Sequence, residues 1–371
     1  MDNTKYIKEL VGIKSFDTTE NKEIIDYLQT AFGKYTKNII RVKNAEDDRE
    51  NLIIGINTPL ENINDAIVLA GHIDTVEANL KEYNTNPFVA TTKSDRIYGL
   101  GSIDMKSFFA SILNNVEYLK TKKVPIIVAI TGDEETNFYG VNTVFNTLKQ
   151  LNIVPRFSVI GEPTNSKICY ISKSCFKYEI TVSGKACHSS MPENGINANY
   201  ILARIALYIE KLCKQYYPTT MTANIISGGT KVNIVSDSAR LVYDLRSTSL
   251  NKCNEVQDKM LQYLKRLKRM YKGCEISLKC SLQILPLENK NYGLIKTLCE
   301  KLGVSTADFT GGCEAGYYQN LGGNAIIFGV GDLSLAHKPN EFVSIPEFNS
   351  YQQKLMSLID YLESPVNQEP N

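Results

Sequence analysis

Residues 66–70, Ala66-Ile67-Val68-Leu69-Ala70, form an uninterrupted apolar run that leads directly into Gly71-His72-Ile73-Asp74. Such a run is typical of a β-strand that is buried on both faces, as in a parallel sheet covered by helices. Helical spacing of apolar residues predicts helices at 105–120 and 141–151, so the pattern indicates an α/β domain. Three further runs have the same character as the first: 125–130, 157–160 and 324–328.

The pattern changes between residues 172 and 285. Residues 176–182 alternate apolar and polar side chains, which is typical of a sheet with one solvent-facing side. The elements expected here follow the ferredoxin-like order of strand, helix, strand, strand, helix and strand. We therefore predict an α/β domain with a mixed, largely parallel sheet and helices on both faces, formed by 1–171 and 286–371. An α+β domain at 172–285 is inserted into it, and we expect no regular structure in residues 364–371.

Composition narrows the class of protein. The 371 residues include 41 basic and 40 acidic side chains, a formal net charge of +1, so we expect neither a nucleic acid nor an anionic membrane as partner. No apolar run approaches the ~18 residues that span a bilayer. The segment Met1–Lys5 lacks the pattern of a secretory signal. Nine cysteines without a C-x-x-C pair favour reduced thiols, so we expect a cytoplasmic protein.

Side chains that can bind metal ions follow the four apolar runs. Each run is followed by one of them, in the order His72, Glu135, Glu162 and His337. Ligands bind beyond the carboxyl ends of the strands in an open α/β sheet, so we expect these side chains to gather at one edge. Asp104, just before a predicted helix, is a fifth candidate. Two of the chain's three histidines belong to this set, which makes a chance grouping improbable.

Three carboxylates and two imidazoles suit a pair of zinc ions. So much negative charge at one edge is unfavourable unless cations neutralise it. One bridging carboxylate, with one further carboxylate and one histidine for each ion, would use all five side chains. Asp74 lies on the same strand face as His72 and can orient its ring. Glu134, next to Glu135, is placed to take a proton from an attacking water and pass it to a leaving amine.

These segments resemble a di-zinc peptidase family that includes acetylornithine deacetylase, succinyl-diaminopimelate desuccinylase, carboxypeptidase G and the aminoacylases. The resemblance covers nearly the whole chain. It rests on six segments: 71–76, 98–106, 132–135, 160–164, 184–190 and 336–341.

The resemblance assigns the ligands more closely than the residues alone do. It implies that Asp104 bridges two zinc ions, for which cobalt or manganese can substitute. His72 and Glu162 complete one site, and Glu135 and His337 complete the other. A cis peptide bond after Asp104 is implied as well.

The resemblance also implies roles for side chains outside the ligand set. Glu134 becomes the general acid and base, and Asp74 the residue that orients His72. The inserted domain becomes a lid and the interface of a homodimer. His188 resembles a lid histidine that reaches the partner's site and stabilises the oxyanion. Asn233 and Arg246 resemble lid groups that hold the oxyanion or the substrate carboxylate.

Residues 99–113 and 311–317 look most like the acetylornithine deacetylases of the family. That likeness implies removal of the acetyl group from N-acetyl-L-ornithine to give L-ornithine and acetate, in arginine biosynthesis. Glu314 would then meet the ornithine ammonium group. Cys313 and Ser107 depart from the usual deacetylase pattern, although neither is a ligand.

Several alternatives stay open at this point. Related substrates are N-acetylcitrulline, succinyl-diaminopimelate, other N-acyl amino acids and dipeptides. A non-catalytic binding protein of this fold would normally have lost a ligand or Glu134, and all are present. A cysteine hydrolase would pair Cys187 with His188, but adjacent residues of a strand point to opposite faces.

Overall fold

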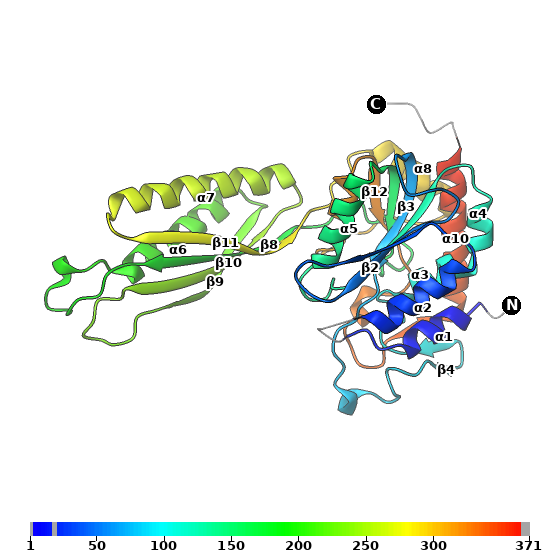
Figure 1. The fold of residues 1–371 in the computed structure, drawn as a ribbon, viewed down its shortest axis with the longest axis horizontal. Coiled ribbons are helices and arrows are strands. Elements are labelled where there is room, and N and C mark those ends of the chain that lie inside the picture. Colours follow the sequence, from blue (N-terminus) through cyan, green and yellow to red (C-terminus); the bar gives the residue numbers. More distant parts are fainter. Residues whose placement is uncertain (1–2, 17–20, 365–371) are drawn as a thin grey trace. The chain divides into compact units, whose positions relative to one another are not determined.

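The structure is a computed structural model that describes residues 3–16 and 21–364 (Figure 1). The chain divides into two compact units, Met1–Ser172 with Leu287–Asn371, and Lys173–Pro286. The amide of Ser172 donates to the Leu287 carbonyl at 3.0 Å, and the Leu287 amide donates to Ser172 Oγ at 3.2 Å. The inserted unit therefore leaves and re-enters the first unit at neighbouring points. Residues 365–371, most of the tail expected to be irregular, lie outside the described residues.

A six-stranded mixed sheet forms the centre of the first unit, in the order β1-β2-β6-β3-β7-β12. β3 runs parallel to β6 and to β7, and β12 runs parallel to β7, whereas β1 and β2 are antiparallel to their neighbours. The predicted fold class is confirmed. The strands are β1 (Ile39–Lys43), β2 (Glu50–Gly55), β3 (Asn64–His72), β6 (Ile126–Thr131), β7 (Val154–Ile160) and β12 (Asn324–Ile327).

Helices cover both faces of this sheet. One face shares a single buried apolar cluster with six of the described helices: α1 (Lys5–Gly12), α2 (Lys22–Gly33), α3 (Lys106–Asn114), α4 (Val116–Lys120), α8 (Tyr292–Leu302) and α10 (Ile345–Glu363). Ile67 and Leu69 of β3 belong to that cluster, while the buried Val68 between them points to the other face. On the other face lie α5 (Tyr139–Gln150) and α9 (Ala315–Gln319), and Figure 1 shows α5 and α10 on opposite sides of the sheet.

The structure differs from expectation in several places. The helix predicted over 105–120 is divided into α3 and α4 (Val116–Lys120), because Asn115 Nδ2 donates to the Ser111 carbonyl that a helical amide would otherwise use. A three-stranded sheet, in the order β13-β5-β4, was not predicted. Its strands have three residues each, which is too short for a clear apolar pattern: β4 (Thr91–Lys93), β5 (Arg96–Tyr98) and β13 (Phe342–Ser344).

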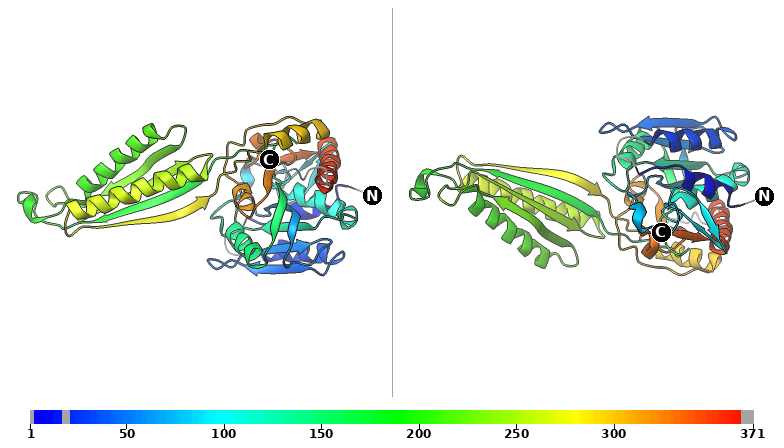
Figure 2. Two further views of the ribbon diagram at one scale, coloured as in Figure 1. Left: turned by 90° about the horizontal axis from the view of Figure 1, so that it is seen from above. Right: turned by 90° about the horizontal axis from the view of Figure 1, so that it is seen from below.

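The second unit has the predicted ferredoxin-like order, with an antiparallel sheet arranged β11-β8-β10-β9. Its two helices contact each other and pack on the sheet (Figure 2). Its elements are β8 (Cys175–Ser183), α6 (Ala198–Gln215), β9 (Thr220–Gly228), β10 (Ser238–Arg246), α7 (Leu250–Met270) and β11 (Glu275–Ile284). Among the described residues of both units, no helix has the length and apolar character needed to cross a membrane.

Candidate metal centre

Three adjacent parallel strands bring the first ligand candidates to one edge of the sheet. His72 is the last residue of β3, which lies between β6 and β7. Glu135 follows β6 and Glu162 follows β7, so both flank His72. The strand order thus explains why residues distant in the sequence meet here.

Asp104 and His337 reach the same place from loops. Asp104 lies between β5 and α3, and the peptide bond from Asp104 to Met105 is cis. His337 lies in the connection that leads from β12 to β13. The two loops are neighbours because β5 and β13 pair with each other, with Tyr98 opposite Phe342.

Asp104 lies between two groups of metal-binding atoms. Its Oδ1 is 3.1 Å from His72 Nε2, and its Oδ2 is 3.1 Å from His337 Nε2. Glu162 Oε1 is 3.9 Å from His72 Nε2, and Glu135 Oε1 is 2.9 Å from His337 Nε2. The candidate ligand atoms of His72, Asp104 and Glu162 lie within 4.8 Å of one another, and so do those of Asp104, Glu135 and His337. The structure therefore brings all five candidates together, with Asp104 common to both groups.

The electrostatics of the cluster favour a bound cation. Burial raises the pKa of Glu162 to about 8. Burial alone would also raise the pKa of Asp104, but hydrogen bonds with His337 and His72 hold it below its usual value. Hydrogen bonds with Asp104 and Glu135 raise the pKa of the half-exposed His337 to about 10. Glu162 Oε1 is buried and has no hydrogen-bond partner in the described part of the chain. Two divalent metal ions fit this donor set, since they would neutralise it and give that oxygen a partner.

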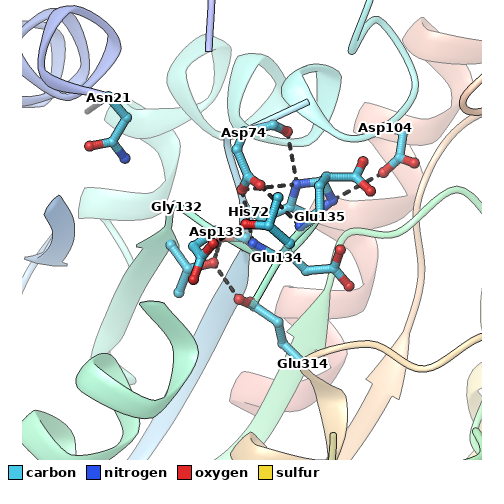
Figure 3. Close-up of polar contacts among 12 residues, drawn as sticks. Asn21, His72, Asp74, Asp104, Gly132, Asp133, Glu134, Glu135 and Glu314 are labelled. Carbon is cyan, nitrogen blue, oxygen red and sulfur yellow. Dashed lines mark hydrogen bonds and ion pairs between the residues drawn. The ribbon is translucent and has the colours of Figure 1, made fainter. Parts of the chain in front are cut away.

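Asp74 supports the centre in two ways (Figure 3). Its backbone oxygen is 3.0 Å from His72 Nδ1, and its Oδ1 is 3.6 Å from the same nitrogen. Its carboxylate also accepts the amides of Glu134, at 3.2 Å, and Glu135, at 3.0 Å. The sequence predicted that Asp74 lies beside His72 on the same strand, but β3 ends at His72 and Asp74 follows it. The support of the turn that carries Glu134 was not predicted.

Glu134 lies beside the ligand groups. One of its carboxylate oxygens belongs to a group with His72 and Glu135 whose candidate atoms are all within 4.8 Å. Burial raises the pKa of Glu134 well above its usual value. Such burial favours the protonated carboxyl, so Glu134 is suited to take up a proton.

A buried ion pair that the sequence did not reveal shapes the same turn. Asp133 and Arg49 are buried and paired, and the Asp133 carboxylate also accepts the Tyr139 amide at 3.0 Å. Arg49 Nη1 donates to Thr136 Oγ1 at 2.8 Å. Arg49 directly precedes β2, so only the fold brings it next to the turn after β6.

Glu314 lies next to the turn, just before α9 (Figure 3). It is 1% exposed, and its Oε1 accepts a hydrogen bond from Thr131 Oγ1. Glu314 Oε2 has no hydrogen-bond partner among residues 3–16 and 21–364. Burial raises its pKa to about 7.

The other predicted site residues belong to the second unit. His188 forms a β-bridge with Ile234, and the Ser189 amide donates to the Asn233 carbonyl at 3.0 Å. Arg246 ends β10, and its Nε donates to Asp244 at 2.8 Å.

Cys187 and His188 do not form a nucleophile–base pair. Cys187 Sγ donates to the Met191 carbonyl at 3.2 Å, while His188 Nδ1 is 2.7 Å from Ser190 Oγ. The different partners of the two side chains argue against a cysteine hydrolase.

The fold and this donor set define a metal-dependent hydrolase with an α/β core and an inserted α+β unit. Residues 68–361 match the family model described as peptidase family M20/M25/M40. The match covers well over half of the chain, so the protein belongs to this family.

Curated relatives agree with that membership. The chain is 31% identical to the acetylornithine deacetylase of Pasteurella multocida over 311 residues, covering 79% of each chain. It is 28% identical to that of Aliivibrio fischeri over 370 residues, covering 91% of this chain and 93% of the relative.

Similar solved structures share the fold at lower identity. A tripeptidase from Staphylococcus aureus superposes with a TM-score of 0.72 at 22% identity, covering 97% of this chain and 98% of that one. The YXEP protein of Bacillus subtilis, described as a dinuclear metal binding peptidase, gives 0.66 at 15% identity, covering 97% and 98%.

Proposed function

We propose that the protein is a zinc-dependent amidohydrolase that converts N-acetyl-L-ornithine and water into L-ornithine and acetate. The reaction type is inferred from the position of Asp104 between His72 and His337, with Glu134 beside them. The substrate is suggested by the deacetylases of Pasteurella multocida and Aliivibrio fischeri, which this chain matches over most of its length. The corresponding setting is arginine biosynthesis in the cytoplasm, where the nine free cysteines would stay reduced.

Two zinc ions would be held by His72 with Glu162 and by Glu135 with His337, and Asp104 would face both. Bound there, they would supply an activated water and polarise the acyl oxygen. Glu134 takes the proton of the attacking water and later delivers it to the nitrogen of ornithine. The amide C–N bond breaks, and the new C–O bond belongs to acetate.

The second unit would supply groups for the substrate and the oxyanion. His188 and Asn233 lie together in segments that precede and adjoin the N-terminal end of β10. Arg246 is the last residue of β10, at its other end. The nine residues of β10 span about 26 Å from the first residue to the last. This separation supports the assignment of the two ends of the unit to different centres. We infer that His188 and Asn233 serve the partner's centre, and that Arg246 binds the substrate carboxylate.

This arrangement requires a homodimer, for which β9 is the favoured surface. Within the described residues β9 is an edge strand, so one of its sides offers backbone groups to another strand. Ile225 and Ile226 on β9 are 49% and 58% exposed, and Tyr200 and Leu207 on the adjacent α6 are exposed as well. Pairing with the same surface of a second copy would bury these apolar side chains.

Glu314 is the proposed source of negative charge for the ornithine ammonium group. Its carboxylate has one oxygen without a partner in the described chain, which a cation could satisfy. Glu314→Gln should raise KM for N-acetyl-L-ornithine and leave KM for N-acetylmethionine unchanged. An unchanged KM for N-acetyl-L-ornithine would remove this residue from the proposal.

The test of the function is a substrate panel with purified, zinc-loaded or cobalt-loaded protein. N-Acetyl-L-ornithine is compared with N-acetylcitrulline, N-acetylmethionine and N-succinyl-diaminopimelate, each with and without a chelator. Chelator-sensitive release of ornithine, well above the other products, is the expected result. Chelator-sensitive hydrolysis of another substrate would support the proposed reaction type but contradict the proposed substrate. No turnover of any substrate by metal-loaded protein would contradict the assignment as an amidohydrolase of this class.

A further inference from the structure

Glu341 presents a buried carboxylate to the loop that carries Asp104. The residue is 2% exposed and directly precedes β13. Its Oε1 accepts the amide of Ile103 at 2.8 Å and the amide of Asp104 at 3.3 Å. Its Oε2 accepts the amide of Gly101 at 3.1 Å. Three amides of one loop thus converge on a single carboxylate.

The backbone of Glu341 fixes the beginning of the same loop. β13 pairs with β5 so that Phe342 lies opposite Tyr98, and the ladder continues with the Gly99 amide, which donates to the Glu341 carbonyl at 3.0 Å. The loop is then closed by the Lys106 amide, which donates to the Gly101 carbonyl at 2.9 Å. Residues 99–106 are therefore held at their start by backbone pairing and in their middle by a side chain.

Glu341 also links two of the candidate ligands. It follows His337 by four residues, and His337 Nε2 lies 3.1 Å from Asp104 Oδ2. The segment 337–341 therefore contacts Asp104 twice, once at its carboxylate and once at its amide. Both Glu341 oxygens are occupied by amides, and Glu341 is absent from the groups of candidate ligand atoms in the described chain. Its geometry is that of a support and not of a ligand.

We propose that Glu341 is a positioning residue that fixes Asp104 between the two metal sites before any metal binds. This inference rests on the proposed two-metal centre. Hydrogen bonds from amides to a carboxylate are stronger than those between neutral groups. If the carboxylate is lost, three loop amides lose their acceptor and the loop must rearrange to satisfy them. Asp104 would then leave the position from which it faces both histidines.

The first test uses Glu341→Gln, which keeps the side-chain length but replaces one acceptor oxygen by an NH2 group. Affinity for zinc and cobalt, metal content and the visible spectrum of the cobalt-loaded protein are measured on folded protein. We expect metal affinity to fall by about 10–100-fold and the cobalt spectrum to change. KM should change little, because Glu341 is not placed to touch substrate. Glu61→Gln, at an exposed carboxyl of the same unit, is the matched control and should behave as wild type.

Wild-type affinities and an unchanged cobalt spectrum in folded Glu341→Gln would overturn the inference. These readouts do not depend on turnover, so failure to hydrolyse N-acetyl-L-ornithine would count against the proposed substrate alone. Hydrogen exchange of the metal-free wild-type protein gives a second test that needs no variant. The amides of Gly101, Ile103 and Asp104 should exchange slowly compared with that of Ser94 in the exposed β4–β5 turn. Rapid exchange of all three until metal is added would show that the loop is not fixed in advance.

Discussion

Carboxylates that hold backbone amides are as prominent in this centre as those that face the metal sites. Asp74 accepts the amides of Glu134 and Glu135, and Glu341 accepts three amides of the Asp104 loop. The sequence predicted the metal-facing side chains because each follows a strand or precedes a helix. It did not predict the amide contacts, because every residue except proline has an amide and the sequence carries no sign of which amide is used.

Glu134 gives the most direct residue-scale prediction. Glu134→Gln keeps the size of the side chain but removes its ability to take up a proton. We expect kcat to fall by about 10²–10⁴-fold while two metal ions remain bound. Steady-state kinetics and metal analysis of the same preparation check this. Glu77→Gln, at an exposed carboxyl of the same unit, should retain activity, and a Glu134→Gln enzyme with near-normal kcat would assign the proton transfer elsewhere.

At the scale of elements, the apolar runs predicted the buried strands well. All of β3 from Ala66 onward is buried, as a continuous run requires. The apolar pattern did not predict the break between α3 and α4, where the Asn115 side chain bonds to the backbone. It also did not predict β1, a strand at the edge of the six-stranded sheet. β1 is only partly buried and contains Arg41 and Lys43, so it has no apolar run to mark it. β1 is recognised as a strand only through its pairing with β2, which the sequence does not show.

The buried ion pair of Arg49 and Asp133 should stabilise the turn after β6. Arg49→Met leaves the Asp133 carboxylate buried without its cation, which typically destabilises a protein by about 3–5 kcal/mol. Urea unfolding followed by circular dichroism measures this. Combining Arg49→Met with Asp133→Asn should restore part of the stability, because no unpaired charge then stays buried.

An exposed pair provides the control for this ion pair. Arg240 and Glu179 form a salt bridge at 2.6 Å on the surface of the second unit. Arg240→Met should change stability by about 0–1 kcal/mol. Equal effects of the two arginine substitutions would mean that the pair of Arg49 and Asp133 does not support the turn.

At the scale of the whole molecule, metal binding should increase the free energy of unfolding. The five donors come from five separate segments of the chain, so metal ions bind the folded chain far better than the unfolded one. Each bound ion adds about 2.7 kcal/mol when its free concentration is 100 times Kd. A chelator should therefore lower Tm by several degrees, and zinc should restore it. His72→Ala should respond much less, whereas an unchanged wild-type Tm would argue against tight metal binding.

If His188 acts in the partner's centre, two inactive variants should restore activity to each other in a mixed dimer. Glu134→Ala and His188→Ala homodimers should both be nearly inactive. In mixed dimers, one of the two centres would combine an intact Glu134 with an intact His188. Unfolding and refolding the two variants together should recover about a quarter of wild-type activity, because about half of the dimers are mixed. No recovery, despite mixed dimers in native mass spectrometry, would place His188 outside the partner's centre.

The insertion of the second unit between Ser172 and Leu287 has a consequence for synthesis on the ribosome. His72, Asp104, Glu135 and Glu162 all precede the insertion, and His337 follows it. At about 5–20 residues per second, a nascent chain would carry four donors for roughly 10–35 s before the fifth is translated. Glu341, which supports the Asp104 loop, is translated only after His337. The emerging polypeptide therefore cannot complete the centre, or begin turnover, until the inserted unit has left the exit tunnel.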